Sequence, residues 1–186
     1  MKKESNVKYI LRLTVTLLLI TACVAAALAG VNAITKDKIA AIQLEKINQA
    51  MEEVLPGYEG FQTCGFSDES GLVKNVYVPA GEGADAYVVE VTPAGFGGEI
   101  TLMVGIQDGA VSGVSIVSHT ETAGLGAVAA DKTEKGASFR GQFAGAEDTL
   151  AVDKDGGTIV AITGATITSR AVADGVNAAL AAQVNR

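Results

Sequence analysis

The sequence predicts an α+β protein that has one N-terminal transmembrane helix and a body in which helices pack on an antiparallel or mixed sheet. Three observations support this fold class. An uncharged segment of 19 residues lies close to the N-terminus, and a series of short strand-like runs follows it. The 22 glycines indicate many turns and argue against an all-helical bundle.

The first twelve residues are basic, with Lys2, Lys3, Lys8 and Arg12 against Glu4, a net charge of +3. Because the whole chain of 186 residues carries −7, the remainder carries −10. Nucleic acid is therefore not an expected partner, since phosphate backbones bind to basic surfaces.

The uncharged segment covers residues 13–31. At about 1.5 Å per residue its helix measures roughly 28 Å, close to the roughly 30 Å hydrocarbon thickness of a bilayer. The basic residues before it place the N-terminus in the cytoplasm. We expect a cytoplasmic N-terminus over 1–12, a single span over 13–33 of the cell (inner) membrane, and an extracytoplasmic body.

Two other interpretations of this segment are a cleaved signal peptide and a lipoprotein signal. Signal peptides have apolar centres of ~7–15 residues and end at a small-residue cleavage site, whereas this apolar run is longer. The string ITAC would direct processing at Cys23, but the apolar stretch after it is unusual for a mature lipoprotein. These features favour an uncleaved anchor.

Residues 34–57 are expected to form an amphipathic linker helix. Thr35 can cap its start, and Pro56 with Gly57 ends it. Its apolar face consists of Ile39, Ile42, Leu44, Ile47, Met51 and Val54. The polar stretch 58–70 shows no clear period.

Residues 58–186 are expected to form one domain. Strands are predicted over 72–78, 86–92, 99–106, 111–118 and 158–162. The pair Asp108-Gly109 predicts a hairpin between the third and fourth of them. A loop over 119–126 precedes a short helix over 127–135, and a final helix is expected over 171–184.

The loop before the final helix, TGATITSR, contains four hydroxyls, those of Thr163, Thr166, Thr168 and Ser169. Thr168 or Ser169 could be the N-cap of the helix. A helix N-terminus is also a phosphate site, because it presents free N–H groups and a positive dipole end. The residues alone leave both interpretations open.

Other candidate sites are weaker. The string GLGAVA fits a dinucleotide fingerprint, but it lacks the βαβ context that this fingerprint needs. His119 is expected to be structural and to bond backbone. Cys23 and Cys64 are not expected to pair, and one histidine cannot build an ordinary zinc site. No metal is expected.

Three strings resemble the motifs of a known family. TGATIT resembles the signature of proteins that carry FMN covalently, while GFGGEITLMVGI and HTETAGLG resemble two upstream segments of the same proteins. With the N-terminal span and the LPG helix end, nearly the whole chain resembles the G subunit of the Rnf-type ion-translocating ferredoxin:NAD oxidoreductase. Ala123 departs from the common proline. The related C subunit of the sodium-pumping NADH:quinone reductase shares the signature but is typically longer.

The resemblance implies FMN esterified through its phosphate to Thr168 by a separate flavin transferase, so that no catalytic base is expected in the chain. The other implied cofactor-binding residues are Thr163, Gly164, Ala165, Thr166, Glu121, Thr122, Gly124, Leu125 and Gly126, with Ser169 as the cap. It implies an electron-relay subunit without a complete active site of its own. In its complex, electron transfer from ferredoxin to NAD would drive the transport of Na+ or H+, and the other subunits would be its partners. The alternatives are a component of the sodium-pumping NADH:quinone reductase like its C subunit, an anchored binding module without a redox role, and a self-standing flavoprotein reductase that serves an external acceptor.

Overall fold

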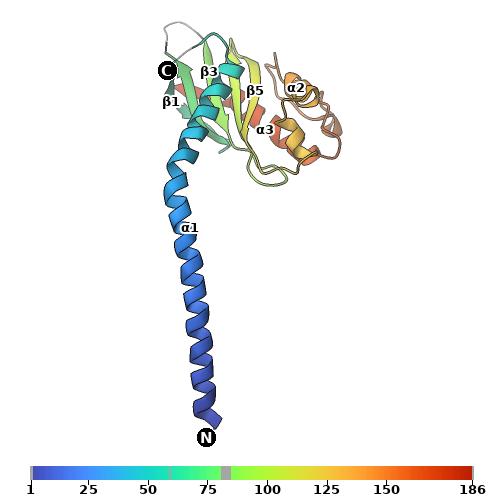
Figure 1. The fold of residues 1–186 in the computed structure, drawn as a ribbon. Helices are drawn as coiled ribbons and strands as arrows, with labels where there is room; N and C mark the ends of the chain where they lie inside the picture. The colour runs from blue at the N-terminus through green and yellow to red at the C-terminus, as the bar shows by residue number, and fades with distance from the viewer. Residues whose placement is uncertain (1, 59, 81–84, 186) are drawn as a thin grey trace. The chain divides into compact units, whose positions relative to one another are not determined.

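The computed structural model describes residues 2–58, 60–80 and 85–185 (Figure 1). The chain forms two compact units, Met1–Glu45 and Lys46–Arg186. The fold class is α+β, as predicted: the helix α1 (Lys2–Val54) contains an apolar span, and an antiparallel sheet with two further α-helices follows it.

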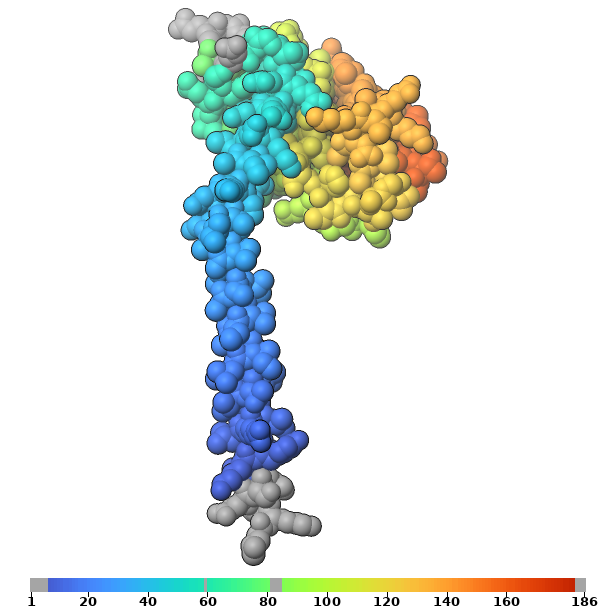
Figure 2. All heavy atoms as spheres, viewed as in Figure 1, coloured from blue at the N-terminus to red at the C-terminus, as the bar shows by residue number. Residues whose placement is uncertain are grey.

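The apolar span and the predicted linker helix are one continuous helix, which is long and apolar enough to cross a membrane. The large apolar side chains from Val7 to Leu44, which lie in the first unit, are exposed. Figure 2 draws this segment in blue. The predicted cap at Thr35 is wrong. Its Oγ1 donates a hydrogen bond to the carbonyl oxygen of Val31 at 2.9 Å, one turn back within the helix.

Within the described residues, six strands form one sheet in the order β5-β4-β3-β2-β1-β6. Each neighbouring pair is antiparallel, so the sheet is antiparallel rather than mixed. The strands are β1 (Phe61–Ser67), β2 (Val73–Pro79), β3 (Ala86–Val91), β4 (Thr101–Gln107), β5 (Ala110–Ser118) and β6 (Gln183–Asn185). The four strands β2 to β5 were predicted, whereas β1 and β6 were not.

The predicted hairpin at Asp108-Gly109 is confirmed. Gln107 pairs with Ala110 across a two-residue turn. Both turn residues have positive φ, 53° at Asp108 and 83° at Gly109, as a type I′ turn requires.

The sheet has a core on each face. Because side chains alternate along a strand, Val88 of β3 lies on one face and Val89 on the other. The first face packs on the end of α1, from Ala50 to Val54, and on Leu55 directly after it. Helices α2 (Glu134–Gly141) and α3 (Thr166–Ala181) cover the second face with the loops beside them.

The predicted strand over 158–162 is wrong, because side chains satisfy backbone groups of Val160 and Ala161 that a neighbouring strand would otherwise bond. The Gln142 amide accepts a hydrogen bond from Val160 N at 2.7 Å and donates one to Val160 O at 3.2 Å. Asp153 Oδ1 accepts from Ala161 N at 3.1 Å. Ile159 forms only an isolated parallel bridge to Val152.

Two predicted helices are displaced. The segment expected to be helical over 127–135 contains the short 3₁₀ helix η1 (Gly126–Ala129), and α2 starts only at Glu134, after a cap in which Thr133 accepts from Gly136 N. Helix α3 begins at Thr166 instead of residue 171. It therefore takes most of the hydroxyl loop into its first turn.

Candidate functional site

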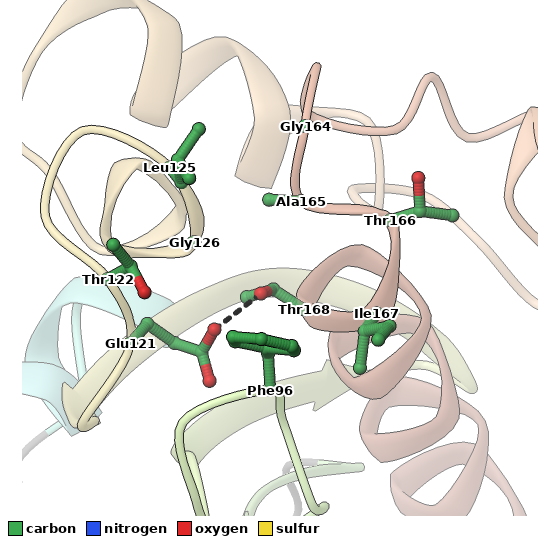
Figure 3. Close-up of a pocket in the computed structure, with 10 residues that line it drawn as sticks. All are labelled: Phe96, Glu121, Thr122, Leu125, Gly126, Gly164, Ala165, Thr166, Ile167 and Thr168. Carbon is green, nitrogen blue, oxygen red and sulfur yellow. Dashed lines mark hydrogen bonds between the residues drawn. The ribbon is translucent and has the colours of Figure 1, made fainter.

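A cavity of about 360 Å³ lies where three loops meet (Figure 3). Its lining comes from the loop before β4, from the segment between β5 and η1, and from the start of α3. The residues are Phe96, Glu121, Thr122, Leu125, Gly126, Gly164, Ala165, Thr166, Ile167 and Thr168. The three segments are those in which the sequence motifs occur.

Thr168 and Glu121 point towards each other in this cavity (Figure 3). Thr168 Oγ1 donates a hydrogen bond of 2.6 Å to Glu121 Oε2. Both residues are buried, with 1% of Thr168 and 9% of Glu121 exposed. The second oxygen, Glu121 Oε1, accepts from the backbone N–H of Gly97 at 2.9 Å. A hydroxyl and a carboxylate are thus fixed together at the inner end of the cavity.

The predicted helix cap is wrong for both Thr168 and Ser169. The N-cap residue is Ala165, and no described side chain caps α3. Ser169 lies within the first turn, where its Oγ accepts from Ile162 N and donates to Ala165 O, both at 3.0 Å. Its role is to fasten the preceding loop to the helix. The first amides of α3 remain available to an anion, since helix termini leave such groups without intrahelical partners.

Glycines make the close packing of this site feasible. A Cβ at Gly126 would lie 2.5 Å from Thr168 Oγ1 and would also overlap Glu121 Oε2. Gly164 has a φ of 79°, in the left-handed region, and Leu125 lies against it. Only glycine at position 126 leaves room for the contact between Thr168 and Glu121.

The rim of the cavity is apolar. Phe96 is 69% exposed, Ile167 49% and Leu125 44%. Exposed side chains of this size and kind, gathered around a concave site, favour a flat, partly apolar ligand.

Charges on the first turns of α3 are paired outside the cavity lining. Arg170 donates two hydrogen bonds to Asp155, from Nε at 2.5 Å and from Nη2 at 2.6 Å. This fork raises the pKa of Arg170 and lowers the pKa of the Asp155 carboxyl. The pKa of Asp174 is raised, chiefly by burial and then by the charge of Asp155.

The structure brings together eight of the ten residues expected to bind the cofactor. The other two, Thr163 and Gly124, line a neighbouring cavity beside α2. Sequence reasoning missed Phe96 and Ile167. Phe96 lies in the quoted GFGG segment, and an aromatic residue between glycines was the available signal.

The weaker candidates have structural explanations. His119 Nδ1 accepts a hydrogen bond from Glu121 N at 3.3 Å, which is the structural role expected of it. The GLGAVA string leads into η1 and not into a βαβ unit, so it is no dinucleotide fingerprint. Within the described residues, no group of three or more His, Cys, Asp or Glu side chains could hold a metal ion.

Comparison with known families agrees with this architecture. The FMN-binding domain family matches residues 95–181, which include all three loops of the cavity. The folded unit is therefore of the FMN-binding class. A second family, described as the RnfG N-terminal region, matches residues 1–54.

Two relatives extend the match to 95% of the chain. The G subunit of the ion-translocating oxidoreductase complex of Methanosarcina acetivorans is 34% identical over 185 residues, covering 95% of each chain. The G subunit of the Na(+)-translocating ferredoxin:NAD(+) oxidoreductase complex of Acetobacterium woodii is 34% identical over 95% of this chain and 92% of its own. The proton-translocating counterpart of Clostridium ljungdahlii is 50% identical over 100 residues, 51% of each chain. The protein belongs to the family formed by the G subunits of the ion-translocating oxidoreductase complexes.

Proposed function

We propose that this protein is an electron-relay subunit that carries FMN esterified through its phosphate to Thr168. One observation carries the proposal. The Thr168 hydroxyl lies at the inner end of a cavity, in the first turn of a helix that no described side chain caps. Such a helix end attracts phosphate, and the adjacent hydroxyl supplies an oxygen for an ester.

The residues present fit FMN. The cavity of about 360 Å³ lies within the range of small-molecule sites, roughly 300–1,000 Å³. The first amides of α3 would hold the phosphate, while Phe96, Leu125 and Ile167 offer apolar surface to the ring. When bound, the flavin supplies the redox chemistry, and the chain supplies position and surroundings. The chain needs no complete active site of its own for this role.

The membrane complex is the expected setting. The relatives of this protein are subunits of complexes that are named for ion translocation. Two of these complexes are named as ferredoxin:NAD(+) oxidoreductases. We therefore infer that this protein works with the other subunits of such a complex, which couples electron transfer between ferredoxin and NAD to transport of Na+ or H+. A separate flavin transferase would attach the FMN.

The anchor and its charges support a location at the cell (inner) membrane. The apolar span in α1 would anchor the chain as a single pass. The basic residues before the span favour a cytoplasmic N-terminus and an extracytoplasmic FMN-binding domain. Similarity to a G subunit over 95% of the chain favours this complex over the related sodium-pumping NADH:quinone reductase.

The test is attachment of flavin to Thr168. Wild type produced with a flavin transferase should show a fluorescent band on a denaturing gel and the mass of one FMN ester. Thr168→Ser keeps the oxygen and should keep some flavin, whereas Thr168→Ala should have none. Thr166→Ala, in the same turn of the helix, should keep the ester. A band that persists in Thr168→Ala would move the ester to another hydroxyl, and no band in wild type would leave an anchored binding module.

A further inference from the structure

We propose that Glu121 takes the hydroxyl proton of Thr168 when the flavin ester forms. This proposal rests on the covalent attachment proposed above, and it changes one expectation of the sequence, that the chain contributes no base. The contact is already made: Thr168 Oγ1 donates to Glu121 Oε2 at 2.6 Å (Figure 3). That distance is within the roughly 2.6–3.2 Å over which a general base acts.

A base is needed because a threonine hydroxyl is a weak nucleophile until its proton is removed. The one histidine of the chain has a structural role instead, since His119 Nδ1 accepts a hydrogen bond from the backbone N–H of Glu121. Among the described residues, Glu121 is the acceptor to which Thr168 Oγ1 donates. The carboxylate therefore has both the chemistry and the position of the base.

The glycine-rich loop before β4 holds Glu121 in place. Gly97 N donates to Glu121 Oε1, and Thr120 Oγ1 donates to Gly97 O, both at 2.9 Å. A Cβ at Gly95 would lie 2.7 Å from Ile100 Cδ1 and would overlap Glu121 Oε1. One oxygen of the carboxylate is thus tied to a backbone amide, which leaves the other directed at Thr168.

The step balances with an activated flavin phosphate, that is, a phosphoanhydride such as a flavin dinucleotide delivered by the transferase. Thr168 Oγ1 forms a bond to the flavin-side phosphorus, and the anhydride P–O bond breaks with its electron pair leaving on the second phosphate. The hydroxyl proton passes to Glu121 Oε2. The oxidation state of the flavin does not change in this step, and Glu121 is left as a carboxylic acid next to the new ester.

The experiment measures the rate of attachment on the full chain, produced without transferase and purified in detergent. Purified transferase and flavin dinucleotide are then added, and gain of mass is followed with time. Glu121→Gln keeps the size of the side chain but not its basicity, and it should react about 100-fold more slowly or worse, the usual effect of a lost general base. Glu121→Asp keeps a carboxylate and should recover part of the rate. Glu147→Gln, on an exposed residue outside the cavity, should match wild type.

A pH profile separates a base from a merely structural residue. The deficit of Glu121→Gln should shrink as pH rises, because hydroxide can replace a base but cannot repair a misplaced hydroxyl. A Glu121→Gln rate within about threefold of wild type overturns the proposal, as does a deficit that is constant with pH and shared by Glu121→Asp. In either case, a wild-type protein that gains the mass of FMN still supports the proposed ester. A wild-type protein that gains no mass contradicts the proposed function itself.

Discussion

Replacing Gly126 by alanine should separate Thr168 from Glu121 without changing either residue. The added Cβ would lie 2.5 Å from Thr168 Oγ1 and 3.0 Å from Glu121 Cβ, and it would overlap Glu121 Oε2. The φ of Gly126 is not in the left-handed region, so the backbone accepts alanine and the effect is steric. The hydrogen bond of 2.6 Å cannot keep its length, because this methyl group would overlap both of its oxygen atoms.

The magnitude follows from two losses. A hydrogen bond to a carboxylate contributes about 1.5–3 kcal/mol, and forcing a methyl group into a packed site costs about 1–3 kcal/mol. A single shift of the side chains relieves part of both losses. Alanine also lowers the conformational entropy of the unfolded chain, which offsets about 0.4–1 kcal/mol of the destabilisation. We therefore expect a net destabilisation on the order of 3 kcal/mol and a fall in Tm on the order of 10 °C.

The assay is thermal unfolding of the full chain in detergent, followed by circular dichroism. Gly141→Ala is the matched control, because a Cβ there meets no atom within 4 Å and Gly141 lies in helix α2. It should be neutral or stabilising by up to about 1 kcal/mol. If Gly126→Ala has the same Tm as the Gly141→Ala control, the packing of Gly126 on the Thr168–Glu121 pair is refuted.

Two further predictions concern topology and charge. In a cysteine-free background, Glu69→Cys should react in intact cells with a membrane-impermeant thiol reagent, because Glu69 is an exposed residue of the body that we propose to be extracytoplasmic. Labelling only after membrane disruption would indicate the opposite orientation. Arg170→Gln should return the pKa of Asp155 towards its ordinary value, measured by NMR titration of that carboxyl, because the guanidinium holds it down. Since the folded pKa lies below the unfolded one, this ion pair stabilises the protein above the unfolded pKa of Asp155, and its contribution is lost as pH falls through the folded pKa. An unchanged titration in the variant would contradict that assignment.

Regular elements were predictable where burial dictates the pattern. Strands β3 and β4 are buried on both faces and appear as apolar runs, and the hairpin between β4 and β5 is specified by Asp108-Gly109. Strand β1 was missed because its apolar side chains are few and Gly65 interrupts them. The run 158–162 looks like a strand, but the side chains of Gln142 and Asp153 occupy its backbone groups. Such side-chain competition has no local signal.

The site was predictable as three strings, and its geometry was not. Thr168 and Glu121 are 47 residues apart, and only the fold makes them hydrogen-bond partners. Gly124 and Gly126 flank the same leucine, yet they line different cavities because the chain turns between them, with a φ of 75° at Gly124. Ile167 resembles an ordinary helix residue until its exposure at the rim is seen.

Helical geometry explains why one loop contains four hydroxyls. Once α3 starts at Thr166, successive side chains point about 100° apart, so Thr166 and Thr168 cannot face the same partner. Figure 3 shows Thr166 pointing away from Glu121 while Thr168 points at it. Ser169 is one turn beyond Ala165 and bonds to its carbonyl, and Thr163 precedes the helix and lines the neighbouring cavity. Each hydroxyl therefore has a direction of its own, and only that of Thr168 combines burial, a carboxylate partner and a place in the first turn of the helix. This division of directions is the physical reason to expect the ester at Thr168 and not at Thr166.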